Sequence, residues 1–93
     1  MPSFYVYILE CLDRNKKKSY YTGYTQDLKK RFELHRQGKG AKYTKGKELT
    51  LLHTEYFLSR SEAMHRELEI KKMSKNQKKD LIQQGARKNS VES

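Results

Sequence analysis

Two aromatic-rich segments near the N-terminus, Phe4–Leu9 and Tyr20–Tyr24, constrain the fold of this chain most strongly. Both consist largely of aromatic and β-branched residues, which favour strands, and the polar segment 10–19 between them cannot fill a core. The pattern therefore predicts a β-hairpin with a long, basic tip. Five of the seven tyrosines lie in this hairpin, which is more phenol groups than strand packing requires.

The first strand is expected to have two different faces, because successive side chains in a strand point to opposite sides. One face carries Tyr5, Tyr7 and Leu9, and the other carries Phe4, Val6 and Ile8. The second face is purely hydrocarbon and is predicted to pack in the core. On the second strand, Tyr21 shares a face with Gly23, and a glycine within a strand often marks a close approach of backbone or ligand.

The rest of the chain predicts three helices and one further strand. The expected elements are a helix capped by Thr25 or Asp27 that runs to about Gln37, a strand over 49–57, a helix capped by Ser59 or Ser61 that runs to about Met73, and a short helix from Ser74 to Gln84 that ends at Gly85. The order β-β-α-β-α-α predicts an α/β (α+β) fold, with a small three-stranded, mainly antiparallel sheet flanked by helices. We expect one domain over residues 1–84 and a flexible polar tail over 85–93.

The charge of the chain favours a polyanionic partner. A net charge of +10 with a pI near 9.8 points to nucleic acid, whereas the absence of a continuous basic amphipathic helix argues against a membrane surface. The alternative is an ordinary solvated, lysine-rich face. A single cysteine excludes an intramolecular disulfide, and the longest apolar run is too short to span a bilayer, so we expect a cytoplasmic protein.

Three polar residues are predicted at inward-facing helical positions. Arg31 and His35, one turn apart, fall on the apolar side of the first helix. Glu67 projects from an apolar arc on the second helix that comprises Ala63, Met64, Leu68, Ile70 and Met73. Each residue also has an ordinary interpretation: a snorkelling arginine, a histidine bonded to a carbonyl, and a Glu67–Lys71 ion pair.

The segment 37–47 is a glycine-rich basic loop. It is not a P-loop, because Lys47 is followed by Glu48 rather than by serine or threonine. Mobile lysines and one tyrosine suit a phosphate backbone and a stacked base, and they suit a solvated loop equally well. The candidate substrate contacts are Gly23, Lys39, Lys42, Tyr43 and Lys45.

Tyrosine, arginine, histidine and glutamate side chains together could hydrolyse a phosphodiester. The reaction needs an activated water and positive charge on the phosphate oxygens, and one carboxylate can hold a single hard divalent cation. The chain resembles the GIY-YIG endonuclease superfamily, most closely its small stand-alone bacterial members, over about residues 3 to 83. The matching segments are Tyr5-Val6-Tyr7, Tyr21-Thr22-Gly23, 27–35, 38–44 and 63–71.

The resemblance implies a metal-dependent endonuclease of weak sequence specificity that acts on DNA in preference to RNA, with a role in DNA repair or recombination. It implies Tyr7 as the general base or its positioning partner, and Tyr21 as the group that orients water or phosphate. It implies that Arg31 binds the scissile phosphate and that His35 assists proton transfer. Glu67 would hold a single Mg²⁺ or Mn²⁺ ion.

The first half of the signature departs from the family pattern. Tyr5 and Val6 stand where the family has glycine and isoleucine, and Thr22 replaces the isoleucine of the second half. Two alternatives therefore stay open. One is a non-catalytic nucleic-acid-binding module that retains the fold, and the other is an adaptor whose basic faces bind an acidic protein.

Overall fold

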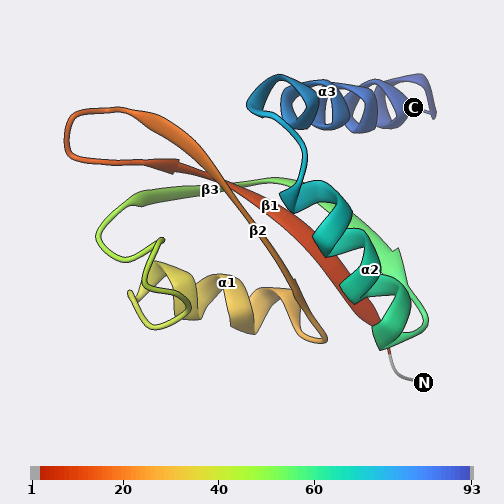
Figure 1. Ribbon diagram of the computed structural model, residues 1–93, viewed down its shortest axis with the longest axis horizontal. Helices are drawn as coiled ribbons and strands as arrows, with labels where there is room; N and C mark the ends of the chain where they lie inside the picture. The colour runs from red at the N-terminus through yellow and green to blue at the C-terminus, as the bar shows by residue number, and fades with distance from the viewer. Residues whose placement is uncertain (1–2, 93) are drawn as a thin grey trace.

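The computed structural model describes the backbone of residues 3–92 and the side chains of residues 3–85. A strongly twisted sheet lies at its centre (Figure 1), with strand order β2-β1-β3 and antiparallel pairing throughout. The elements are β1 (Phe4–Leu12), β2 (Lys18–Thr25), α1 (Leu28–Arg36), β3 (Glu48–Phe57), α2 (Arg60–Lys71) and α3 (Lys75–Glu92). This order and the antiparallel sheet confirm the predicted fold class.

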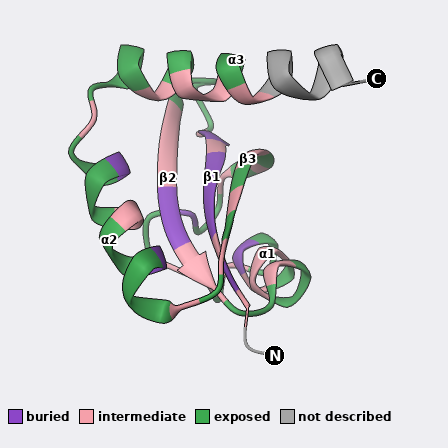
Figure 2. Cartoon of the chain, turned by 90° about the vertical axis from the view of Figure 1, so that its right-hand side faces the viewer, coloured by how far each residue is buried: buried purple, intermediate pink, exposed green. Residues whose placement is uncertain are grey.

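Helices cover both faces of the sheet, so the core consists of two layers. Figure 2 shows α1 and α2 on opposite sides of the sheet, with α3 across one end. The hydrocarbon face of β1 packs with α2 and α3 in a cluster that includes Phe4, Val6, Ile8, Ala63 and Ile70. The tyrosine-bearing face packs under α1 in a second cluster that includes Tyr7, Leu9, Cys11, Leu28 and Phe32. The predicted core face is confirmed, and the tyrosine face is covered as well.

The helices begin where the capping residues predict. Asp27 accepts a hydrogen bond from the backbone N–H of Lys30 at the start of α1, and Ser59 caps α2 in the same way. At α3, Ser74 and Gln77 exchange side chain–backbone hydrogen bonds in a complete capping box. These bonds satisfy backbone donors that a helix start otherwise leaves unpaired.

The last helix is longer than the sequence predicts. The expected end at Gly85 is wrong, because α3 continues to Glu92. Glycine within a helix lowers its stability by about 1 kcal/mol relative to alanine. Gly85 nevertheless lets α3 pack closely on His53, because a Cβ at this position would lie only 3.2 Å from Nδ1 of that residue. The boundary between the domain and a flexible tail stays a prediction, and Ser93 lies outside the described residues. No helix in the described part of the chain is long and apolar enough to cross a bilayer.

The apolar arc predicted for α2 is only partly buried. Ala63 and Ile70 are fully covered, but Met64 is 43% exposed and Leu68 is 53% exposed, so the prediction that they pack inward is wrong. The arc is too wide for one helix to press all of it against a sheet, and Ala63 and Ile70, two turns apart, take the contact. Met64 and Leu68 therefore form an exposed apolar border beside Glu67.

Candidate active site

The pairing register of the hairpin places Tyr7 directly opposite Gly23. A Cβ at Gly23 would lie 2.5 Å from the Tyr7 hydroxyl oxygen and 2.7 Å from Cζ, far inside van der Waals contact. The Tyr7 ring therefore occupies the space that any other residue on β2 would fill. A close approach does occur at this glycine, but the approaching group is a tyrosine side chain and not the backbone or ligand that the sequence led us to expect.

His35, on α1, lies against both tyrosines of this face. Its Nε2 and the Tyr7 hydroxyl are hydrogen-bonded at 2.9 Å. The ring of Tyr21 meets the imidazole edge-on, with ring centroids 5.2 Å apart. His35 is buried, so its position on the inward side of α1 is confirmed.

Two residues of the glycine-rich loop also contact His35. The hydroxyl oxygen of Thr44, which is buried, lies 2.8 Å from Nδ1 of the imidazole. Gly40 packs directly on the ring, since a Cβ there would lie 2.5 Å from Nδ1. Sequence reasoning assigned no role to either residue, although their position in a glycine-rich loop after the helix was the available signal.

Burial keeps Tyr7 and His35, which are hydrogen-bonded to each other, uncharged at neutral pH. Burial raises the pKa of Tyr7 strongly, and the charges of Tyr21 and Glu67 add to this, whereas Arg31 opposes it. Burial also lowers the pKa of His35, and the positive charge of Arg31 lowers it further. The charges of Arg31 on α1 and of Glu67 on α2 thus both influence the Tyr7 hydroxyl, while His35 is hydrogen-bonded to it and Tyr21 packs against His35.

Arg31 is available to an anionic ligand. Within residues 3–85, the side chains that form ion pairs do not include it. Its guanidinium offers a planar fork of donors that matches a phosphate. A half-buried arginine that lies near two neutral groups and pairs with no carboxylate in this range is the arrangement expected of a phosphate-binding residue.

Glu67 is half-buried and pairs with Lys71, whose Nζ lies 3.6 Å from Oε2. The ion pair that the sequence offered as the ordinary interpretation is therefore present. The described residues contain no group of three or more histidine, cysteine, aspartate or glutamate side chains that could hold a metal. Glu67 would therefore have to act as a single carboxylate ligand, which suits a hard cation such as Mg²⁺ because that ion keeps most of its water ligands.

The basic loop adjoins this cluster through Tyr43. The Tyr43 ring stacks on Tyr21 with centroids 6.1 Å apart and an interplanar angle of 22°, and Nζ of Lys47 lies 3.6 Å from the Tyr43 centroid. The three lysines predicted to contact substrate are exposed on the same loop: Lys39, Lys42 and Lys45. The stacked pair thus connects the loop to the tyrosine that contacts His35.

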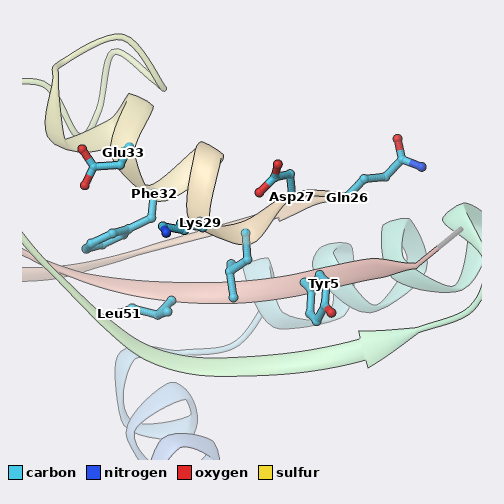
Figure 3. A pocket seen from close by; sticks show the side chains of 8 residues that line it. Tyr5, Gln26, Asp27, Lys29, Phe32, Glu33 and Leu51 are labelled. Atoms are coloured by element: carbon cyan, nitrogen blue, oxygen red, sulfur yellow. The ribbon is translucent and has the colours of Figure 1, made fainter.

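A separate hollow of about 600 Å³ lies between α1 and the β1–β3 side of the sheet (Figure 3). Its lining includes Tyr5, Leu28, Phe32 and Leu51, with Asp27 and Glu33 at the rim. None of the five residues predicted to be catalytic lines it. The candidate active site is therefore the Tyr7–His35 cluster, and this apolar hollow is not part of it.

The fold and the cluster together define a GIY-YIG protein. The model of the GIY-YIG catalytic domain matches residues 3–80, and the chain belongs to this family. The resemblance predicted from the motifs is confirmed.

Similar relatives are small proteins of comparable length. A UPF0213 protein of Halobacterium salinarum is 51% identical over 79 residues, which cover 84% of this chain and 97% of the relative. A UPF0213 protein of Staphylococcus haemolyticus is 47% identical over 85 residues, which cover 90% of this chain and 99% of the relative. The solution NMR structure of a UPF0213 protein from Bacillus halodurans shares 41% identity with a TM-score of 0.51, and the match covers 87% of this chain and 83% of that one.

Membership in this family places the chain among nuclease domains. The partner of such a domain is nucleic acid, and nucleases of this family generally depend on a divalent metal.

Proposed function

We propose that this protein is a divalent-metal-dependent endonuclease that hydrolyses phosphodiester bonds in DNA. The observation that carries the proposal is the hydrogen bond of 2.9 Å between Tyr7 and His35, with Arg31 and Glu67 acting on the same hydroxyl. Hydrolysis of a phosphodiester needs a proton acceptor, a phosphate-binding cation and a metal-binding carboxylate, and the Tyr7–His35 pair, Arg31 and Glu67 would supply these three groups.

The Tyr7–His35 pair would activate the attacking water by a proton relay. Because the pKa of Tyr7 is raised, its hydroxyl is protonated before the reaction and cannot act alone as a base. As water attacks phosphorus, its proton passes to the Tyr7 oxygen while the Tyr7 proton passes to Nε2 of His35. The new P–O bond forms as the bond from phosphorus to the leaving oxygen breaks, and the leaving oxygen then takes a proton from solvent water. Arg31 would bind two non-bridging oxygens of the scissile phosphate, and the negative phosphate would then favour the imidazolium that forms.

Glu67 would hold the metal ion, Mg²⁺ or Mn²⁺, with water and phosphate oxygens as the remaining ligands. A bound divalent cation supplies positive charge to the phosphate oxygens and to the leaving oxygen. The Glu67 carboxylate would exchange its contact with Lys71 for the cation.

The basic loop would position the backbone of the substrate. Lys39, Lys42 and Lys45 are exposed beside the stacked Tyr21–Tyr43 pair, and Gly23 keeps the space around Tyr7 free of a β2 side chain. Contacts of lysine with phosphate carry no sequence information, so we propose weak sequence specificity. We further propose a cytoplasmic location and a role in DNA repair or recombination.

The test of the metal site is the variant Glu67→Gln. Loss of a metal ligand removes several kcal/mol of transition-state stabilisation, so we expect cleavage with Mg²⁺ or Mn²⁺ to fall by about 100-fold or more. Binding of Mn²⁺, measured by electron paramagnetic resonance in the absence of DNA, should fall in parallel.

The matched control is Glu69→Gln, which removes the same charge from the same helix. Glu69 pairs only with His65 and Arg66 among the described side chains, so its loss should leave cleavage within about threefold of wild type. Undiminished cleavage and Mn²⁺ binding by Glu67→Gln would place the metal elsewhere and contradict the proposal.

A second candidate function is a non-catalytic nucleic-acid-binding module. The pairing of Glu67 with Lys71 and the raised pKa of Tyr7 favour it, because both describe groups that are not ready for catalysis by themselves. This function predicts salt-dependent binding of DNA with no cleavage at any concentration of divalent metal. Metal-dependent cleavage that is lost in Glu67→Gln would exclude it.

A further inference from the structure

The hydrogen bonds around Thr44 fix which nitrogen of His35 carries hydrogen. The Thr44 hydroxyl has one hydrogen, and its oxygen lies 3.1 Å from the backbone carbonyl of Ala41, which can only accept. The hydroxyl therefore donates to Ala41 and can only accept from its other close partner. That partner is Nδ1 of His35 at 2.8 Å, so Nδ1 must carry the hydrogen.

The consequence extends to the opposite side of the ring. A neutral imidazole with hydrogen on Nδ1 has a lone pair on Nε2. The Tyr7 hydroxyl lies 2.9 Å from Nε2 and must then be the donor in that bond. A single chain of donors leads from Tyr7 through His35 and Thr44 to the Ala41 carbonyl, and every hydrogen in it has an acceptor.

The loop also prevents the ring from turning over. A Cβ at Gly40 would lie 2.5 Å from Nδ1 and 2.9 Å from Cα of His35, so the loop backbone lies directly on the imidazole. Tyr21 meets the ring from another side, with centroids 5.2 Å apart, and both His35 and Thr44 are buried. Water cannot substitute for the threonine without displacement of the loop.

We propose that Thr44 is a positioning residue that holds His35 in the Nδ1–H tautomer, so that Nε2 is ready to accept the proton of Tyr7. The effect of Thr44 on catalysis rests on the proposed nuclease function, whereas the tautomer of His35 does not depend on that function. Thr44 would act only through His35, because it is buried and its contacts are with the ring and the loop backbone. The other tautomer would make Nε2 a donor and stop the relay.

The first test is the tautomer of wild-type protein, measured by long-range ¹⁵N–¹H correlation NMR with the His35 signals assigned from His35→Gln. We expect the pattern of a neutral ring protonated at Nδ1 at pH 7.5. A ring protonated at Nε2 would overturn the proposal. This test needs neither DNA nor metal and is independent of how any Thr44 variant folds.

The second test compares Thr44→Val with Thr44→Ser. Valine keeps the shape but removes the acceptor, so we expect a mixture of tautomers and a kcat lower by about 10- to 100-fold, the usual loss when a group that orients a functional histidine is removed, with KM within about threefold. Serine keeps the hydroxyl and should retain the Nδ1–H tautomer and kcat within about threefold. Equal losses in the two variants would indicate that the methyl group matters and would overturn the assignment.

The two levels of the proposal fail separately. If the wild type shows the Nδ1–H tautomer but no metal-dependent cleavage, the nuclease function is wrong and the tautomer assignment stands. If the wild type cleaves DNA and Thr44→Val retains both the tautomer and the full kcat, the positioning role is wrong and the nuclease function stands.

Discussion

At the scale of single residues, the site depends on one hydroxyl group, that of the buried Tyr7. Gly23 leaves space for the Tyr7 ring, and His35 is hydrogen-bonded to the Tyr7 hydroxyl. Burial raises the pKa of this hydroxyl. A phenol in such a place is a poor base by itself and a good donor to a neutral imidazole. The roles proposed for these residues therefore depend on the pair and on neither member alone.

The variant Tyr7→Phe tests this directly. Removal of the hydroxyl leaves the ring packing intact but eliminates the relay, so we expect cleavage to fall by about 100-fold or more. The unfolding free energy should fall by about 1–2 kcal/mol, because Nε2 of His35 loses its partner inside the protein. Nuclease assays and urea unfolding provide the two measurements.

Tyr5→Phe is the matched control, because Tyr5 lies on the same face of the same strand. Its ring packs against Tyr56, with centroids 5.5 Å apart, and it lines the apolar hollow rather than the site. We expect unchanged cleavage from Tyr5→Phe. Similar reductions in both variants would mean that the effect comes from the sheet and not from the hydroxyl.

At the scale of elements, a polar network on the opposite face ties α2 to β3. Arg66 donates two hydrogen bonds to Glu55, at 2.7 and 3.0 Å, and His53 lies 2.8 Å from the same carboxylate. Burial alone would raise the pKa of Glu55, but the hydrogen bonds from His53 and Arg66 outweigh it and lower the pKa to about 2. The helix that carries Glu67 is therefore anchored one residue away from it.

We expect Arg66→Gln to lower the unfolding free energy by about 2 kcal/mol at pH 7, since a partly buried carboxylate loses charged hydrogen bonds. The ordinary pKa of glutamate is 4.5, and the pKa of Glu55 in the folded protein is about 2. The stabilisation that ionised Glu55 gives to the folded state is therefore complete above pH 4.5 and is lost as the pH falls through 2. The difference in unfolding free energy between Arg66→Gln and wild type should therefore become smaller as the pH falls from 4.5 to about 2. Urea unfolding at pH 7 and at pH 3 measures it.

Arg36→Gln is the control for this prediction. Arg36 forms one hydrogen bond of 2.9 Å with Glu33 on the exposed side of α1. An exposed pair of this kind contributes about 0–1 kcal/mol, so the variant should stay within about 1 kcal/mol of wild type at both pH values. A destabilisation by Arg36→Gln equal to that by Arg66→Gln would contradict the anchoring role of Glu55.

At the scale of the whole molecule, the charge of +10 on 93 residues determines how the protein meets its partner. Lysines that neutralise phosphates release counterions from the nucleic acid. The logarithm of the binding constant should therefore fall linearly with the logarithm of the salt concentration. The exposed loop lysines beside Tyr43 are expected to contribute most to this dependence, since they lie next to the candidate active site.

The double variant Lys42→Gln/Lys45→Gln should reduce the magnitude of the salt slope on duplex DNA by about 1.8, because each lysine that no longer neutralises a phosphate removes about 0.9. The affinity for DNA is measured by fluorescence anisotropy at salt concentrations between about 50 and about 200 mM, where the affinity changes enough to give a reliable slope. Lys79→Gln, exposed on α3, is the control and should leave the slope nearly unchanged. Equal slopes for the double variant and wild type would show that the loop does not bind phosphate.

Sequence by itself determined the elements of this protein and the identity of the family. Caps such as Asp27 and the Ser74–Gln77 box act within a few residues, and the alternation of aromatic side chains in β1 depends only on neighbours in the chain. The helical positions of Arg31 and His35 follow from the same short-range periodicity. For this reason the fold class and the five candidate residues could be predicted from the sequence.

Tertiary structure alone decided how those residues meet. The hydrogen bond between Tyr7 and His35 joins positions 28 residues apart, and it requires the β2-β1-β3 order and the register that opposes Tyr7 with Gly23. The exposure of Met64 and Leu68 and the passage of α3 through Gly85 likewise depend on what packs nearby. Long-range interactions of this kind have no local signature, because the free energy that fixes them comes from packing between segments and not from the propensity of any one segment.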